Sequence, residues 1–157
     1  MIIKTKKTKL ENKTYIRQAL INVNLELWWV WLIPLGISAL TFFYTTVWFI
    51  IIAVVLSLLY LLFWLAQFIA VTQLEQNKVM FEKMTYEIDS RQIIMKLNTK
   101  QGMPMNWDMI KKVRTGKEAY TLILSKAQLI YLPKKAFNSD NEIKFFESIL
   151  KRKSLIK

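Results

Sequence analysis

The sequence predicts a membrane-embedded helical hairpin followed by a small cytoplasmic domain of the α+β class. Three observations lead to this fold class. The 157 residues are 54% hydrophobic, and residues 27–74 form a run of 48 without any Asp, Glu, Lys or Arg. All 34 charged residues therefore lie outside this run. Residues 75–157 instead alternate short β-like segments with turn residues and end in an amphipathic helix.

The uncharged run is too long for one membrane crossing, which takes about 20 residues, and fits two crossings joined by a turn. We expect spans at residues 27–44 and 47–71, with Thr45 and Thr46 between them. The second span is longer than a bilayer requires, so it should tilt or protrude. Small residues should let the two helices approach closely where Ser38 lies opposite Ala53 and Gly36 lies opposite Val55.

The charges on either side of the hairpin predict its orientation. Residues 1–26 carry six basic and two acidic side chains, and the segment after residue 74 carries 17 basic and nine acidic ones. Because positively charged flanks stay on the cytoplasmic side, both termini should be cytoplasmic. The expected location is the cytoplasmic (inner) membrane, with two spans and almost nothing on the far side.

Residues 1–26 should form a short strand and then an amphipathic helix. The β-branched residues Ile2, Ile3 and Thr5 favour a strand that pairs with a later sheet. The segment Thr8-Lys9-Leu10-Glu11 matches a capping box, which predicts a helix from about Lys9. Apolar residues then recur at helical spacing and lead into the first span: Ile16, Leu20, Val23 and Leu27.

The segment 75–157 should fold as antiparallel strands closed by one helix. Gly102 and Pro104 indicate a loop, Thr115–Glu118 indicates a hairpin turn, and Ser139 opens the final helix as a cap. The predicted strands are 79–89, 93–97, 109–114, 120–124 and 128–132. This pattern is typical of a small antiparallel barrel or sandwich, with the helix covering an open end or edge.

Several residues of this domain resemble the YcxB-like family of bacterial membrane proteins. The resemblance lies in Trp107-x-x-Ile110-x-x-Val113, in Tyr120, and in the run Leu132-Pro133-Lys134-Lys135-Ala136-Phe137 before the last helix. It implies two membrane spans, a bacterial source and a C-terminal domain similar to pleckstrin-homology (PH) folds. It implies no catalytic residue and no ligand.

The composition argues against catalysis. The chain has no Cys and no His, which removes thiol chemistry, the commonest general base and the usual zinc ligands. With three glycines, Gly36, Gly102 and Gly116, it has no glycine-rich phosphate loop. We therefore expect no enzymatic activity, no catalytic residue, no cofactor and no metal site.

Two groups of residues are candidates for binding. The net charge of +12 includes clusters that could contact anionic lipid headgroups: Lys111, Lys112, Arg114, Lys117, Lys134 and Lys135. Alternatively, these charges serve only to set the topology. Nucleic acid is not expected, because most aromatic residues lie in the hairpin. An apolar docking surface for a protein is expected at Met103, Pro104, Met105 and Trp107.

The resulting hypothesis is a non-enzymatic membrane-anchored interaction or accessory module. Its partners would be membrane lipids and either a larger membrane complex or further copies of itself. A second hypothesis is an anionic-lipid sensor or envelope-stress regulator. A third, an immunity factor against a membrane-active toxin, needs only an anchor and a binding face.

Overall fold

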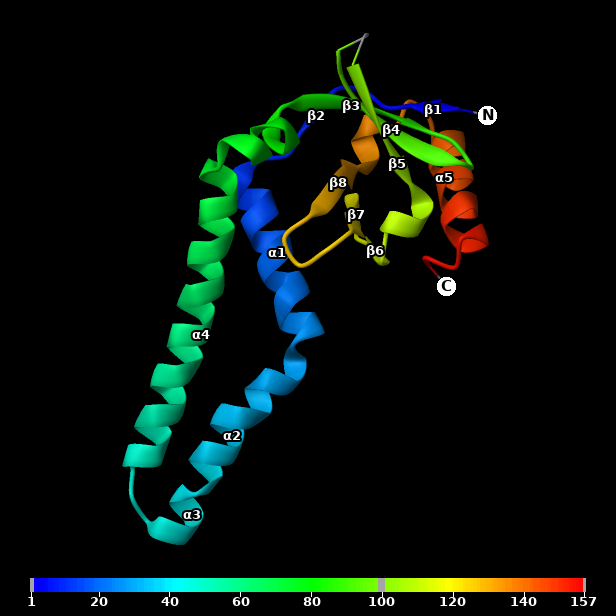
Figure 1. Cartoon of the computed structure of the whole chain (residues 1–157). Helices are drawn as coiled ribbons and strands as arrows, with labels where there is room; N and C mark the ends of the chain where they lie inside the picture. The colour runs from blue at the N-terminus through cyan, green and yellow to red at the C-terminus, as the bar shows by residue number, and fades with distance from the viewer. Residues whose placement is uncertain (1, 99–100, 157) are drawn as a thin grey trace.

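The computed structural model describes residues 2–98 and 101–156. A long helical hairpin extends from a sheet domain, which packs beside the end of the hairpin opposite its turn (Figure 1). The N-terminal strand belongs to the sheet domain, so the chain leaves this domain, passes through the hairpin and returns to it.

The hairpin has one continuous arm and one broken arm. Its helices are α1 (Asn12–Glu26), a 3-10 turn (Trp28–Trp31), α2 (Leu32–Ala39), α3 (Thr41–Tyr44) and α4 (Trp48–Gln73). Among the described residues, α4 is the one helix that is by itself long and apolar enough to cross a membrane. The segment Trp28–Tyr44 meets that criterion only together with α1, from which it bends by 74°. These helices indicate possible membrane association.

The turn lies where the sequence predicts it. Thr45 ends α3 in the left-handed conformation, with φ of 45°, and Val47 precedes α4. The first predicted span, however, is broken into three short helical pieces rather than one helix. Ala53 is buried at the hairpin interface as expected, whereas a Cβ at Gly36 would meet no atom within 4 Å, so close packing at Gly36 is not formed.

The predicted helix start near Lys9 is wrong. Thr8 and Lys9 form strand β2 (Thr8–Lys9), paired with β3 (Lys83–Ile88), and α1 begins only at Asn12, without a side-chain cap. Thr8 and Lys9 adopt the extended backbone that pairing with β3 requires, so they cannot also form the first turn of a helix. The expected N-terminal strand is present as β1 (Ile3–Lys4), which pairs antiparallel with β3.

Two antiparallel sheets make up the domain. The first has the order β1-β3-β4-β5, with β2 also paired to β3, and includes β4 (Gln92–Asn98) and β5 (Gln101–Asn106). The second has the order β6-β7-β8, with β6 (Lys112–Thr115), β7 (Ala119–Ile123) and β8 (Leu129–Pro133). Over residues 2–98 and 101–156 the strands form no closed barrel, so the barrel alternative is not supported.

Three predictions for the strand region need correction. The strand expected at 109–114 starts only at Lys112, because Trp107–Met109 forms a 3-10 helix. The strand expected at 79–89 starts only at Lys83, because Glu75–Phe81 forms a 3-10 helix after α4. The loop expected around Gly102 and Pro104 is strand β5. Pro104 is tolerated there because β5 lies at the edge of its sheet, where a missing N–H costs no pairing.

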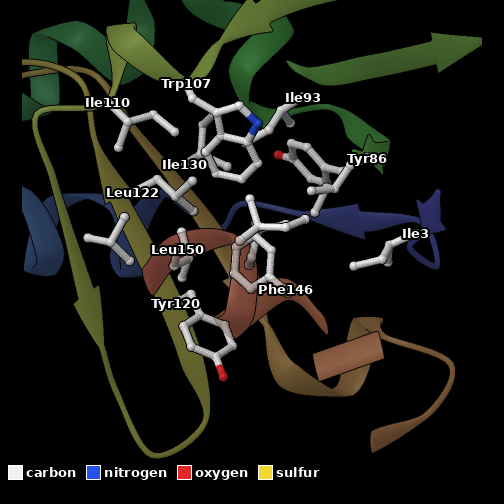
Figure 2. Close-up of a cluster of buried hydrophobic side chains, with 14 of the residues drawn as sticks. Ile3, Tyr86, Ile93, Trp107, Ile110, Tyr120, Leu122, Ile130, Phe146 and Leu150 are labelled. Atoms are coloured by element: carbon white, nitrogen blue, oxygen red, sulfur yellow. The ribbon is translucent and has the colours of Figure 1, made fainter. Parts of the chain in front are cut away.

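The C-terminal helix α5 (Asp140–Arg152) closes the domain as predicted. The backbone N–H of Glu142 donates to the Ser139 hydroxyl, which caps the helix. Phe146 is fully buried and contacts Trp107, Tyr120 and Phe137. Figure 2 shows Phe146 between side chains of both sheets, including Tyr86. We call this cluster the sheet core, to which α5 contributes Phe146, Ile149 and Leu150.

A second hydrophobic cluster joins the domain to the helices, and we call it the junction cluster. Tyr15 of α1 lies at its centre, with its ring edge-on to Phe68 of α4 and to Phe81. The Tyr15 hydroxyl donates to the carbonyl of Ala127, in the β7–β8 connection, at 2.7 Å. The buried members are Leu10, Tyr15, Ala19, Val23, Phe68, Phe81 and Leu129.

Candidate functional site

Four of the six predicted basic residues line two separate hollows in the domain surface. Lys134 and Lys135 line a cavity of about 660 Å³, together with Lys7 and Lys9 from the N-terminal segment. It lies against the start of α1, near Glu11 and Thr14. We call it the distal cavity, because this end of α1 is the one farther along the chain from the uncharged run. The Lys134 ammonium also lies 5.1 Å from the centre of the Tyr120 ring, so part of its charge interacts within the domain.

Lys111 and Lys112 lie at a different place, in a smaller hollow of about 250 Å³. We call it the proximal notch, because its other wall is the last part of α1, directly before the uncharged run begins. Its lining residues are Asn22, Leu25, Glu26, Lys111, Lys112, Ile123, Ser125 and Lys126. No local pattern in the sequence indicates that Asn22 lies beside Lys111 and Lys126, because Asn22 is far from both in the chain.

Arg114 was expected to contact lipid headgroups, but its side chain points toward α1 rather than outward. Its Nη2 donates to the Asn22 Oδ1 at 3.2 Å. The Asn22 Nδ2 and the Arg114 Nη1 are buried and have no hydrogen-bond partner in the part of the chain that the structure describes. Burial lowers the pKa of the Arg114 guanidinium, because desolvation disfavours the charged form. Lys117 lies apart from the notch residues, exposed in the β6–β7 turn.

The predicted protein-docking residues divide into two exposed and two buried ones. Met103 is 57% exposed and Pro104 is also exposed. Met105 and Trp107 are each 2% exposed and belong to the sheet core, so they are unavailable for docking. The Trp107 Nε1–H donates to the carbonyl of Asp89 at 3.0 Å, which satisfies its one polar group.

Six methionines nevertheless meet at one hollow, which sequence reasoning did not predict. Met80, Met84, Met95, Met103, Met105 and Met109 all line an apolar hollow of about 240 Å³. They come from the 3-10 helix after α4, three strands and the turn after β5. The only sequence signal was their concentration after residue 79, which does not show that they share a surface.

The acidic side chains are dispersed. Within residues 2–98 and 101–156, no group of three or more metal-ligating side chains gathers at one point. Glu87 pairs with Lys96 at 2.7 Å and with Lys4 at 3.5 Å across β1, β3 and β4. The hydrogen bond from Lys96 holds the pKa of the Glu87 carboxyl below its usual range. This is a cross-strand contact of the sheet surface.

Comparison with known proteins identifies part of the domain. A family model described as YcxB-like protein matches residues 88–150, from the end of β3 into α5. This confirms the resemblance seen at residues 107–137. No curated protein and no solved structure matches the chain.

Proposed function

With residues 88–150 identified as a YcxB-like region, we propose that the protein is a non-enzymatic, membrane-anchored interaction module. It would dock to a larger membrane complex or to further copies of itself. The observation that carries this proposal is the junction cluster, which packs a sheet domain directly onto a helical hairpin whose apolar outer surface is uncovered.

The exposed surface of the hairpin supports a membrane location. Only 6% of the most apolar part of α4 is buried within the protein. A core helix of a soluble protein would bury most of such a segment, since large apolar surfaces are rarely left in water. Phe42 and Phe43 near the turn are 89% and 82% exposed. A bilayer would cover all of these side chains.

The aromatic side chains suggest where the cytoplasmic interface lies. Trp31 stacks edge-on with Tyr60, and Tyr60 with Trp64. Trp28 and Trp29 are exposed at the same end of the first arm. Such belts favour the headgroup region of a bilayer. The end of α4 beyond Trp64 would then protrude into the cytoplasm, where Phe68 joins the junction cluster.

We also propose that the domain is PH-like and that the protein resides in a bacterial inner membrane with both termini cytoplasmic. Two antiparallel sheets over a shared core, closed by one C-terminal helix, support the fold proposal. The basic flanks and the uncharged turn support the orientation.

The topology is tested by cysteine labelling, since the chain has no Cys of its own. A Thr45→Cys variant in intact cells should react with an impermeant thiol reagent, because Thr45 lies in the turn. An Asn141→Cys variant, exposed on α5, should react only after the membrane is opened. The reverse pattern would overturn the orientation.

The interaction function is tested by extracting the full chain in mild detergent at high salt, followed by sizing and mass spectrometry. A stoichiometric companion or a homo-oligomer is expected, because apolar contacts persist when salt screens charges. A Met103→Glu, Met109→Glu double variant should lose the companion, and Ile2→Glu, another exposed apolar position, should keep it. A monomer without any companion contradicts the proposal.

The second candidate function, sensing of anionic lipids, is favoured by the proximal notch. Three lysines lie there next to the last turn of α1. Association that depends on these lysines should weaken strongly as salt rises. The extraction experiment therefore separates the two candidates by their response to ionic strength.

A further inference from the structure

We propose that the proximal notch binds the phosphate of an anionic membrane phospholipid whose headgroup also carries hydroxyl donors, such as phosphatidylglycerol. This inference rests on the membrane anchoring proposed above. It assigns a specific ligand site, whereas the interaction function does not require one.

Among the described residues, a buried hydrogen-bond donor at the notch lacks an acceptor. Asn22 lines the notch and is only 6% exposed. Its Oδ1 accepts from Arg114, which fixes the orientation of the amide, because a flipped amide would place two donors face to face. The Asn22 Nδ2 and the Arg114 Nη1 are then both donors without a partner among residues 2–98 and 101–156. Buried donors are nearly always satisfied, and Asn22 lines the notch whereas Arg114 does not, so a phosphate oxygen bound in the notch would supply the acceptor for the Asn22 Nδ2.

The charge and the size of the notch both suit a small anionic headgroup. Lys111, Lys112 and Lys126 line the notch against one carboxylate, Glu26, so an anion is favoured. Glu26 and the carbonyl end of α1 are the negative features, and they suit a ligand that brings hydroxyl donors beside its phosphate. The volume of about 250 Å³ is below the roughly 300–1,000 Å³ of sites for drug-sized molecules, which suits a small polar headgroup.

The notch lies next to the start of the uncharged run. Leu25 and Glu26 line the notch, and the uncharged run begins with the next residue, Leu27. Trp28 and Trp29 follow directly and are exposed. Figure 1 shows this end of α1 where the chain bends into the second half of the arm. A lipid whose acyl chains lie along the hairpin would present its phosphate at this level.

The distal cavity provides a matched control. It contains four lysines, Lys7, Lys9, Lys134 and Lys135, beside two carboxylates, Glu11 and Glu118. The distal cavity lies against the start of α1, whereas the uncharged run follows the end of this helix. Most of the length of α1, which has 15 residues and rises about 1.5 Å per residue, therefore separates the cavity from that run. Its lysines carry similar charge at a place where no headgroup of the anchoring membrane should reach.

The test uses the full chain in nonionic detergent, with native mass spectrometry to measure binding of dihexanoyl phosphatidylglycerol. Dihexanoyl phosphatidylcholine and inorganic phosphate serve as comparison ligands. A Lys111→Gln, Lys112→Gln, Lys126→Gln variant should bind phosphatidylglycerol on the order of a hundredfold more weakly. The matched variant Lys9→Gln, Lys134→Gln, Lys135→Gln should bind within about threefold of the natural chain, because its charges act only at a distance.

Asn22→Asp gives a second, nearly isosteric test. The new carboxylate would pair with Arg114 and repel a phosphate, so binding should fall about tenfold or more while the melting curve stays in place. If this variant fails to fold, the lysine variants still decide the outcome.

Three results would overturn the site. Equal losses in the notch and distal variants would show diffuse charge attraction. Equal binding of phosphatidylcholine would show that the anionic headgroup is not selected. Saturation by inorganic phosphate at the same concentration would assign the notch to a soluble anion instead of a lipid. Alkaline washing of membranes separates these failures from a failure of anchoring, because a chain released by washing was never integrated.

Discussion

The sheet core and the junction cluster hold different parts of this protein together, although both are built around aromatic side chains. The sheet core draws Trp107, Tyr120 and Phe146 from within the domain. The junction cluster instead combines Tyr15 of α1, Phe68 of α4 and Leu129 of β8. The first cluster makes a domain, and the second fixes that domain against the hairpin.

The two clusters differ in which part of the structure should be lost when each is disrupted. Loss of the sheet core removes the contact between the two sheets and α5, so the domain should unfold. Loss of the junction cluster should leave both sheets intact and free the domain from the helices. Polar contacts add to the junction, since Tyr15 bonds to Ala127 and Arg114 bonds to Asn22.

The largest expected effect comes from Phe146→Ala in the sheet core. The free energy of unfolding of the domain should fall by about 3–5 kcal/mol, because the side chain is fully buried and leaves a cavity. Chemical denaturation followed by near-UV circular dichroism measures this change. Lys144→Ala, an exposed neighbour on α5, is the control and should change little. An unchanged midpoint for Phe146→Ala would contradict the assignment of this core.

Phe68→Ala should weaken the junction cluster and leave the sheet core unchanged. Removing this buried ring should destabilise the docked arrangement by about 3 kcal/mol, yet the domain itself should stay folded. Spin labels at Gln67→Cys and Lys126→Cys report the distance between α4 and the β7–β8 connection. A broader distance distribution with an unchanged domain spectrum is expected. Concerted unfolding of the domain would show that the two clusters form one unit.

Tyr15→Phe should have a smaller effect, about 1 kcal/mol, because it removes one hydrogen bond while keeping the ring. Burial raises the pKa of Tyr15 to about 12. A raised pKa means that the docked state favours the neutral hydroxyl, so docking is complete below about pH 10 and weakens as pH rises toward 12. The same spin-label pair, titrated with base, should show this loss. In the Tyr15→Phe variant, the part of this pH-dependent loss of docking that comes from the Tyr15 hydroxyl should be absent.

The smallest effect is expected at Glu87→Gln on the sheet surface. Its contacts with Lys96 and Lys4 are partly exposed, so their loss should cost at most about 1 kcal/mol. Because the pKa of Glu87 is lowered in the folded domain, its contribution is present above the ordinary carboxyl range. It should disappear as pH falls through the lowered pKa. Natural and variant domains should therefore have converging melting temperatures in acid.

Local patterns predicted the elements that depend on local signals. The capped α5, the turn at Thr45–Thr46 and the β6–β7 turn lie where the sequence indicated. Predictions failed where a distant partner decided the outcome. Thr8 and Lys9 pair with β3, about 75 residues away, and so form a strand rather than a helix start. Pro104 continues a strand because β5 happens to be an edge.

The candidate sites were harder to predict for the same reason. Trp107 was expected on a docking surface, but its partner Phe146 lies on α5 and buries it. Arg114 was expected to face lipid, but Asn22 lies 92 positions earlier in the chain and binds it. No local spacing rule connects residues so far apart, and such contacts follow only from the way the domain packs on α1.

The direct packing of the domain on the hairpin has a consequence for how partners are met. A domain on a flexible tether samples many heights and orientations above its membrane, and each binding event must suppress that freedom. Here Tyr15 and Phe68 hold the domain in one orientation relative to α4. For a partner in the same membrane, the methionine-lined hollow would therefore lie at a constant distance from the bilayer and in a constant orientation. Little orientational entropy would then be lost when the two associate.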